Sequence, residues 1–425
     1  MLRHCCLLLC SAVAAAGFFH PNGVVEIRID GSGAYTSFNQ LEIALDSALS
    51  SPCTAAIVIV AQEPSGSMDD VKLLASLPSD AHVALLRQES AIHEKLRTAP
   101  CPVMAVGEGV VEHAALGIFL ASSERLVTER TNLKMVGCQK LMLPSGLSLL
   151  APLAASSTSF DGGDEKEGED SLLGESQRAA MVMALALGGA SINAHDAAEL
   201  KLSSMFCEAS ELPSLLSELR VAPSDYLDVP LSRHSEPVPA MHAHLFADRV
   251  VVDAVERCFG PTCRDAADML VRLDAERKRV AMLTRSYGCH VRERAETVAE
   301  ILEEASAALD PRRSSPSALA ATFAVLRLCW RSLRAKGRAR GTAGARDESE
   351  AVDTSSLQAQ ALLANERLLA RVDFVEALRV REMNGRPVRS GRPAAARVVP
   401  RWQPSTLGSA ALEVASEIEA GWSVE

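Results

Sequence analysis

Aromatic residues are scarce in this chain of 425 residues, where Phe, Trp and Tyr together make up 4% of the sequence. Apolar residues still account for 48%, and alanine and leucine supply most of that volume. These two residue types favour helices, whereas an all-β sandwich is built largely from β-branched and aromatic residues. The composition therefore argues against a sandwich and predicts helix-rich packing, in one large domain or two smaller ones.

Positive charge is also in short supply. The chain has 43 Lys and Arg against 54 Asp and Glu, which gives a net charge of −11 at pH 7. This balance argues against broad nucleic-acid binding by charge alone. A local exception lies at residues 331–346, which contain Arg331, Arg334, Lys336, Arg338, Arg340 and Arg346.

The basic segment belongs to a predicted interruption at 334–356, which begins RAKGRARG and then turns acidic with RDESE. One interpretation is a flexible surface insertion. The other is a segment that contacts RNA or a partner protein through its clustered basic residues.

Metal-ligand and disulfide spacings are absent. The 11 cysteines form no repeating framework, and Cys258 and Cys263 make a C-x4-C pair without a second pair at metal spacing. His242 and His244 likewise have no further ligand cluster near them in sequence. We therefore expect no metal site, and reduced thiols in an intracellular compartment.

The N-terminus has no acidic residue before Glu26, but it has Arg3, His4 and an apolar run from Cys5 to Phe19. This run is too short for a convincing transmembrane helix, and no membrane association is expected. One interpretation is a secretory signal with Ala14-Ala15-Ala16 near its cleavage point, and the other is an organellar presequence. The free cysteines favour the second, so 1–22 is predicted to be an organellar targeting segment, and the resemblance described below makes the mitochondrion the expected organelle.

Strand and helix patterns alternate along the next part of the chain. Val24–Ile29 alternates like a half-buried strand, and Ala55–Val60 is a continuous β-branched run typical of a buried parallel strand. Helical spacing separates these strands at Ser37–Leu49, and a helical stretch at Ser90–Arg97 precedes a strand at Val103–Val106. The order predicts βαβ units and a mostly parallel sheet, hence the α/β class.

Farther along, helical patterns dominate. Residues 156–177 are acidic and rich in Gly and Ser, which predicts a solvated loop. Helical periodicity returns from Arg178 to Leu202, and nearly everything after Leu245 has a helical pattern. We therefore expect an α/β core at 23–220 and a helical region at 221–425.

Several short motifs, in order, resemble 3-hydroxyisobutyryl-CoA hydrolase, a branch of the enoyl-CoA hydratase/isomerase (crotonase) superfamily. In the core they are Ala99–Gly109, where a proline precedes a strand that ends at a glycine, Glu124–Thr131 (like "fRVATEkT") and Leu143–Gly146 (like "FPDVG"). In the C-terminal half they are Ser314–Leu319 (like "SPtSL"), Asn365–Leu369 (like "mEyRL"), Asp373–Arg379 (like "DFxEGvRA") and Arg401–Leu407 (like "kWkPasL"). The ordered set lies across most of residues 23–415.

The resemblance implies a crotonase fold, a ββα-type spiral core with mostly parallel sheets, plus the helical C-terminal region of the hydrolase branch. It also implies acyl-CoA thioester hydrolysis in valine catabolism, in the mitochondrial matrix. No cofactor is expected, because coenzyme A enters only as part of the substrate. The oligomeric state is not predicted.

An oxyanion hole is the first part of the site that the resemblance implies. Two backbone N–H groups polarise the thioester oxygen, one of them at a helix N-terminus. They fall at Ala114, within His113-Ala114-Ala115 where the family has three glycines, and at Asp69. Glu89 matches the last acid of the family's "REEY" substrate-binding stretch, although a surface helix glutamate is the alternative interpretation.

Acidic residues are the second part, since a carboxylate must orient or activate water. The family's glutamate position falls on Gly137 and its aspartate position on Ser145, and the hydratase branch's glutamate falls on Gly117. All three acids are therefore missing. His113 as a shifted base is a weak substitute, because the residue before the donor points away from the thioester in the family. Ser145 as a nucleophile is no better, because no adjacent base is indicated.

Two hypotheses follow. The first is a functional or residual thioester hydrolase. The second, which the missing acids favour, is a non-catalytic member reused as a scaffold. A specific version of the second is a structural component of the mitochondrial ribosome small subunit, with 331–346 contacting ribosomal proteins or RNA.

Overall fold

The structure is a computed structural model of the chain. It describes residues 17–29, 38–61, 79–135, 146–155, 173–189, 191–223, 227–234, 249–286, 298–303, 305–307, 309, 315–343, 357–359 and 361–364.

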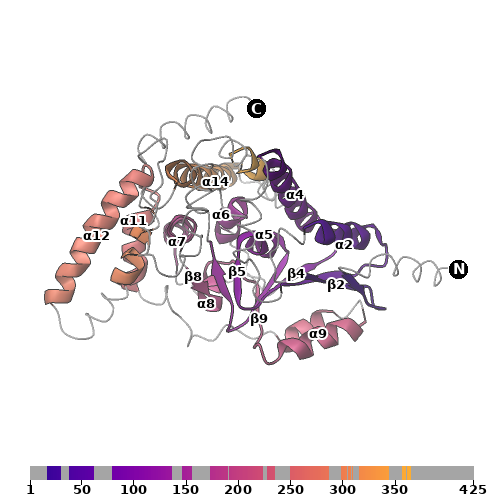
Figure 1. The fold of residues 1–425 in the computed structure, drawn as a ribbon. Coiled ribbons are helices and arrows are strands. Elements are labelled where there is room, and N and C mark those ends of the chain that lie inside the picture. Colours follow the sequence, from indigo (N-terminus) through magenta and orange to yellow (C-terminus); the bar gives the residue numbers. More distant parts are fainter. Residues whose placement is uncertain are drawn as a thin grey trace, which may run out of the picture.

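Six strands form the larger sheet, in the spatial order β1-β2-β3-β4-β6-β9 (Figure 1). Their bounds are β1 Gly17–Phe19, β2 Val24–Ile29, β3 Ala56–Ala61, β4 Val103–Gly107, β6 Glu124–Val127 and β9 Met205–Phe206. Neighbouring strands pair in parallel, except that β1 and β2 are antiparallel. Helices connect the parallel strands: α2 (Phe38–Ser50), α4 (Ser79–Arg97) and α5 (His113–Ala121). The predicted α/β class with a mostly parallel sheet is confirmed.

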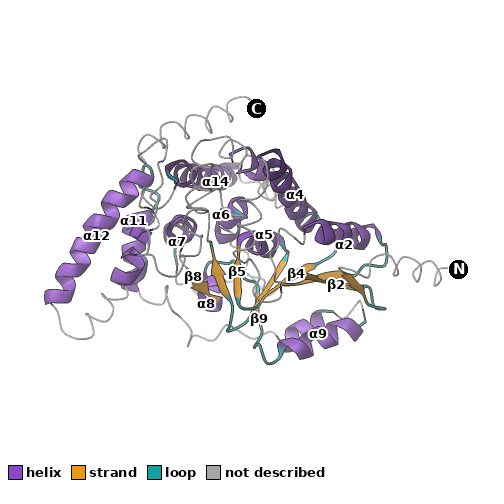
Figure 2. Ribbon diagram, viewed as in Figure 1, coloured by secondary structure: helices purple, strands orange, loops and turns teal. Residues whose placement is uncertain are grey.

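Both faces of this sheet are covered. On one face, Val25, Ile57 and Ala105 join a large apolar cluster with α2, α4 and α5. On the other, Val58 and Met104 join a smaller cluster with α9 (Leu212–Val221), which lies below the strands in Figure 1. Figure 2 shows the same arrangement, with helices on either side of the strands.

The prediction for Val24–Ile29 was partly wrong. The segment is a strand, but Val24, Val25 and even Glu26 are buried, so β2 is covered on both faces rather than half-buried. The alternation of apolar and polar residues misled the prediction because α9, about 190 residues further along the chain, covers the second face.

The N-terminal boundary also differs from the prediction. Residues 17–22 were assigned to the targeting segment, yet β1 pairs with β2, with Gly17 opposite Ile27 and Phe19 opposite Val25. The folded part of the chain therefore includes Gly17.

A smaller sheet carries the order β5-β7-β8. Its strands are β5 Val110–Glu112, β7 Asn132–Lys134 and β8 Ser191–Asn193, with β5 parallel and β8 antiparallel to β7.

Strand β8 interrupts the helix predicted at 178–202. Helix α7 (Glu175–Gly188) ends at Gly189, whose φ of 64° is left-handed, and α8 (Ala194–Glu199) begins where the Asn193 side chain accepts a hydrogen bond from the Asp196 N–H at 2.9 Å. A glycine C-cap followed by an asparagine N-cap ends one helix and begins another.

The C-terminal helices share the core of the sheet region. Helix α11 (Arg249–Phe259) packs on α7, α14 (Pro316–Ala343) packs on α6 (Leu147–Ala155) and α7, and α12 (Ala266–Ser286) packs on α11 and α14 (Figure 1). Their buried residues belong to the same apolar cluster as β2 and β3. Helix α10 (Asp228–His234) packs on α9.

The two predicted interruptions are only partly described. Residues 156–172 of the acidic loop lie outside the described residues, and α7 already begins at Glu175. Helix α14 continues to Ala343, so residues 334–343 are helical rather than a flexible insertion, while 344–356 lie outside the described residues.

Across the described ranges, no helix combines the length and the apolar composition that crossing a bilayer requires.

A buried ion pair connects the first strands to α9. Glu26 is 3% exposed and accepts hydrogen bonds from Arg220 Nε (2.8 Å), Arg220 Nη2 (3.1 Å) and Arg28 Nε (2.8 Å). Burial alone would raise the pKa of Glu26, but the hydrogen bonds from Arg220 and Arg28 hold it below its ordinary value. Asn22 Nδ2 adds hydrogen bonds of 2.7 Å to the carbonyl oxygens of Leu219 and Ala222 at the end of α9.

Candidate functional site

Helix α5 carries Ala114, one of the two predicted oxyanion-hole residues. The chain leaves β4 at Gly107, turns through Gly109 at a φ of 73°, forms β5 and enters α5 at His113. The pairing of β5 with β7 fixes where the helix begins. The first N–H groups of a helix have no acceptor within the helix, so this end of α5 presents donors at the position that the resemblance implies.

His113 has a left-handed backbone, with a φ of 52°. A left-handed residue followed by a helical one points successive N–H groups toward one side, the geometry of an anion-binding nest. A non-glycine residue rarely adopts this conformation, and the strain amounts to about 1–2 kcal/mol. His113 thus keeps a backbone conformation that suits glycine, although this chain has His113, Ala114 and Ala115 where the family has three glycines.

Replacing His113 with glycine is expected to leave the fold intact and raise the free energy of unfolding by up to about 1 kcal/mol, because glycine adopts positive φ without strain. The comparison is chemical denaturation of His113→Gly and wild type. A matched His113→Ala variant keeps the strained conformation, so it should show no gain. If only the His113→Gly variant is less stable than wild type, the backbone at His113 is not strained.

The thioester approach to Ala114 is closed in this structure. Ala114 is 0% exposed, and every residue of α5 from Ala114 to Ala121 is buried. A thioester oxygen therefore does not reach the Ala114 N–H without movement of the surrounding chain.

Gly117, where the hydratase branch has a glutamate, is in tight contact with the chain before α6. Gly146 has a φ of 69°, and a β-carbon built on it would lie 3.0 Å from Gly117 Cα and 3.2 Å from Leu120 Cδ1. Such a separation is below ordinary van der Waals contact, so two glycines allow this close approach. The backbone of one segment thus lies against the position from which the acid would project.

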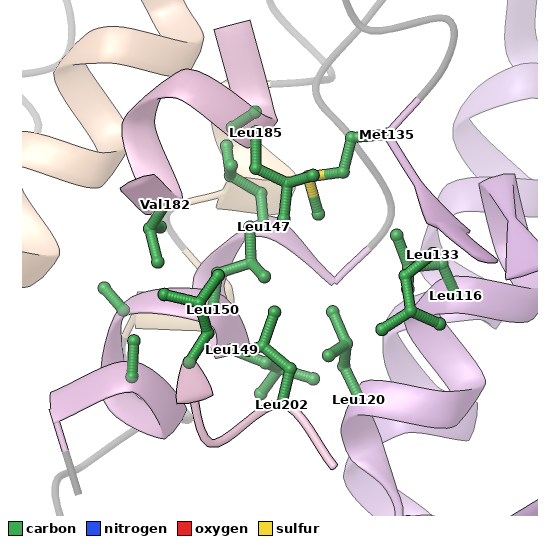
Figure 3. Close-up of a cluster of buried hydrophobic side chains, with 14 of the residues drawn as sticks. Leu116, Leu120, Leu133, Met135, Leu147, Leu149, Leu150, Val182, Leu185 and Leu202 are labelled. Atoms are coloured by element: carbon green, nitrogen blue, oxygen red, sulfur yellow. The ribbon is translucent and has the colours of Figure 1, made fainter. Parts of the chain in front are cut away.

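Aliphatic side chains fill the interior beside this contact (Figure 3). They come from α5, β7, α6, α7 and the segment after α8, and all are buried: Leu116, Leu120, Leu133, Met135, Leu147, Leu149, Leu150, Val182, Leu185 and Leu202. Within the described residues, this part of the molecule is a packed apolar core, and the labelled side chains are all leucine, valine or methionine.

Glu89, the predicted substrate-binding residue, lies on the buried face of α4. It is 6% exposed, and the same face carries buried His82, Leu86, His93 and Leu96 at helical spacing. The alternative interpretation, a surface helix glutamate, is wrong. A chemical role for Glu89 stays a prediction.

Glu89 has a histidine neighbour one turn along α4. Its Oε1 lies 4.0 Å from His93 Nε2, beyond direct hydrogen-bond distance. From the C-terminal part, Gln358 Nε2 donates to the neighbouring Ser90 carbonyl oxygen at 2.7 Å. Sequence reasoning missed this group, although the spacing of residues 82, 86, 89, 93 and 96 on one helix face was a usable signal.

His93 should make the protein acid-sensitive. It is 4% exposed, and burial, with a smaller contribution from the positive charge of Arg97, lowers its pKa from 6.5 to about 4. Between these values the unfolded chain binds a proton that the folded chain does not, so stability falls as the pH drops from 6.5 toward 4. From pH 7.5 to pH 5 we expect His93 to remove about 2 kcal/mol of unfolding free energy.

The measurement is urea denaturation of wild type and His93→Gln at both pH values. Glutamine does not titrate, so the variant should lose about 2 kcal/mol less than wild type on acidification. Equal losses in the two proteins would show that Glu89 or another nearby group keeps His93 charged.

The remaining predicted positions lie outside the described residues. They are the second oxyanion-hole residue Asp69, the two acid positions Gly137 and Ser145, and the pair His242 and His244.

Cys258 and Cys263 are buried free thiols, and Cys263 Sγ donates to the Cys258 carbonyl oxygen at 3.0 Å. Burial raises the pKa of Cys258 to about 12 and that of Cys263 to about 11, which keeps both protonated. Across the described ranges, no three His, Cys, Asp or Glu side chains gather as a metal-binding group.

Two further buried carboxylates are neutralised by arginines. Glu26 is paired with Arg28 and Arg220, and Glu276 accepts hydrogen bonds from Arg257 and Arg279. Both have a pKa below the ordinary value, since these hydrogen bonds outweigh the effect of burial. Such pairs stabilise a fold and do not serve as general bases.

Comparison with known proteins identifies the fold. No protein-family model and no curated protein matches the sequence. Among solved structures, an enoyl-CoA hydratase from Rhodobacter sphaeroides 2.4.1 matches at a TM-score of 0.64 and 17% identity, over 95% of this chain and 96% of that one. A carnitinyl-CoA dehydratase from Mycobacterium thermoresistibile matches at a TM-score of 0.62 and 15% identity, over 94% of this chain and 95% of that one.

The chain therefore has the crotonase fold, and the predicted fold is confirmed. Since both matches cover nearly the whole of each chain, the likeness includes the C-terminal helices. At these identities the likeness shows the fold alone.

Proposed function

We propose that this crotonase-fold chain is a 3-hydroxyisobutyryl-CoA hydrolase-like protein with little or no hydrolase activity, whose fold serves as a scaffold. The absence of a carboxylate at Gly137 and Ser145, where the resemblance places the hydrolase's two acids, carries the proposal. The ordered sequence motifs support the hydrolase branch, and the matrix of the mitochondrion is the proposed location.

The chemistry explains why the missing acids matter. Hydrolysis requires a carboxylate to activate water or attack the thioester, and a polarised thioester oxygen to accept the developing charge. The left-handed backbone of His113 would suit the second requirement, but Ala114 is buried. The required carboxylate would come from positions 137, 145 and 117, but Gly137, Ser145 and Gly117 have none. The loss of one placed catalytic carboxylate typically costs ~10²–10⁴ in rate.

Steady-state release of CoA thiol from 3-hydroxyisobutyryl-CoA tests the proposal. Wild type should release thiol at the background rate, and turnover at an ordinary enzyme rate would contradict the scaffold. The double variant Gly137→Glu, Ser145→Asp should exceed wild type, because it restores both acids at the positions that the resemblance implies. No gain in the double variant would mean that those positions are misaligned or that the site stays closed.

A residual hydrolase is the runner-up. It is favoured by the left-handed His113, which keeps the donors of the nest oriented, and by the interior position of Glu89. Under this alternative, Glu89→Gln should lower a measurable thiol-release rate, whereas under the scaffold proposal no rate above background exists to be lowered.

A ribosomal role is the specific scaffold that we propose for testing. The basic segment is largely helical, since α14 extends through it to Ala343. A helix with repeated Arg and Lys suits contact with RNA phosphates or acidic protein surfaces. Co-sedimentation with the small subunit of mitochondrial ribosomes in sucrose gradients would support the role, and recovery solely as a free soluble pool would contradict it.

A further inference from the structure

Helix α12 has one face in the core and one face in solvent. It lies at the left edge of the ribbon in Figure 1, with α11 between it and α7. The core face is buried at spacings of four and three residues: Met269, Leu273, Glu276 and Val280. The opposite face is therefore continuous along the same turns of the helix.

The solvent face of α12 is defined by six exposed residues, hereafter the α12 stripe: Val271, Asp274, Ala275, Lys278, Ala281 and Met282. Residues three or four positions apart are neighbours on a helix surface, so these side chains form one row. Val271 is 69% exposed and Met282 is 62% exposed, which places them among the most exposed large apolar side chains of the described residues. One exposed apolar residue is ordinary, but two in line on one face indicate a surface for a partner.

The order of residues along the α12 stripe is complementary to itself. It runs apolar, acid, small, base, small, apolar, and reversing the direction exchanges the acid with the base. The midpoint between Val271 and Met282 coincides, to within one residue, with the midpoint between Asp274 and Lys278. A second copy that runs antiparallel thus sets apolar ends against apolar ends and acid against base.

The charges of the stripe favour this direction. Lys278 Nζ lies 2.6 Å from Asp274 Oδ2 one turn away on the same helix, and both side chains are exposed. In an antiparallel pair, Asp274 of each copy faces Lys278 of the other copy, so two opposite-charge contacts form. In a parallel pair, acid would face acid and base would face base, which is repulsive.

We propose that two copies of this chain associate through the α12 stripe, with the two helices antiparallel about a two-fold axis at the level of residue 276. Such an interface uses the same surface of both chains. The stripe has one charge of each sign, which suits a second copy better than a strongly acidic or basic partner. A contact limited to one helix is small, so the dimer is reversible and its population rises with protein concentration. This inference does not depend on the proposed function.

Sedimentation velocity of the full chain, over a series of concentrations at low salt, tests the proposal. Wild type should shift from monomer to dimer as the concentration rises. Asp274→Lys and Lys278→Asp each set like charges against each other twice, and each should weaken dimerisation by roughly tenfold or more. An equimolar mixture of these two variants should recover the dimer, because the two bases of one variant then face the two acids of the other.

Arg130→Asp is the matched control, since it makes the same change of charge at an exposed arginine on the turn after β6. It should dimerise like wild type. Thermal unfolding of all variants in dilute solution should give the wild-type melting temperature, because an exposed ion pair contributes little to stability. Three results would overturn the proposal: a monomer at every concentration, association that the α12 variants leave unchanged, or no recovery in the mixture.

The apolar ends of the stripe have their own test. Val271→Gln should weaken the dimer by roughly tenfold, because the two-fold axis removes this side chain from both halves of the interface. Val221→Gln is the matched control, since Val221 is also highly exposed but lies on α9. Equal effects of the two substitutions would contradict the assignment to α12. A monomeric wild type whose binding to mitochondrial ribosomal particles is lost in Asp274→Lys would assign the stripe to another partner and overturn the dimer.

Discussion

Replacement of Gly117 with glutamate is expected to lower the free energy of unfolding by roughly 3–5 kcal/mol and to create no hydrolase activity. Because every residue of α5 from Ala114 to Ala121 is buried, a glutamate here enters packed interior whichever way it points. Gly146 lies close by, with a β-carbon built on it 3.0 Å from Gly117 Cα, and α5 has no charged residue from Ala114 to Ala121 that could pair with the new acid.

Urea denaturation measures this effect, with Ala91→Glu as the matched control. Ala91 is exposed on α4, so the same side chain there should change stability by less than about 0.5 kcal/mol. If Gly117→Glu keeps wild-type stability, the interior beside α5 has room for an acid, and the description of this region as packed is wrong.

Replacement of Arg220 with methionine is expected to lower the free energy of unfolding by roughly 3 kcal/mol. It leaves the buried Glu26 with Arg28 and, at 3.7 Å, His20 as its partners. Methionine retains the apolar stem, so the loss reports the charge and its two hydrogen bonds rather than packing. Equilibrium denaturation of the variant and wild type at pH 7 is the measurement.

Arg249→Met is the control, because Arg249 is exposed and its Nε lies 3.7 Å from Asp253 Oδ1 on the same helix. Arg249→Met should lower the free energy of unfolding by about 0.5 kcal/mol or less. The low pKa of Glu26 contributes stability above the ordinary glutamate pKa, and this contribution is lost as the pH falls through the lower, folded-state value. Arg220→Met should therefore also be less acid-sensitive than wild type. If the two arginine variants lose equal amounts of unfolding free energy, the ion pair between Glu26 and Arg220 does not stabilise the packing of α9.

The elements of the fold were predictable where one local pattern determined them. The β-branched run at 55–60 and the helical spacing at 37–49 correspond to β3 and α2 within a residue or two. The misassigned places depend on distant contacts. The alternating pattern placed Glu26 on the exposed side of a half-buried strand. Its burial is explained by Arg220 and α9. Residues 17–19 were assigned to the targeting segment because their pairing with β2 cannot be recognised from the local sequence.

The sequence predicted which catalytic acids are missing from the candidate site, but it did not predict how the segments around the site pack. The absence of acids at Gly117, Gly137 and Ser145 follows from the aligned motifs alone. That Gly146 packs against Gly117 depends on how α5 and α6 meet, which no short motif encodes. Likewise, the burial of Glu89 beside His93 depends on the partners of α4, including Gln358 from the far end of the chain.

Single-turnover hydrolysis tests the central claim most directly. Purified protein is held in large excess over 3-hydroxyisobutyryl-CoA, and release of CoA thiol is compared with an equal concentration of serum albumin. With no carboxylate at the three acid positions and α5 packed against α6, thiol should appear at the same rate in both solutions. A complete burst of thiol within seconds, in proportion to the thioester added, would contradict the account.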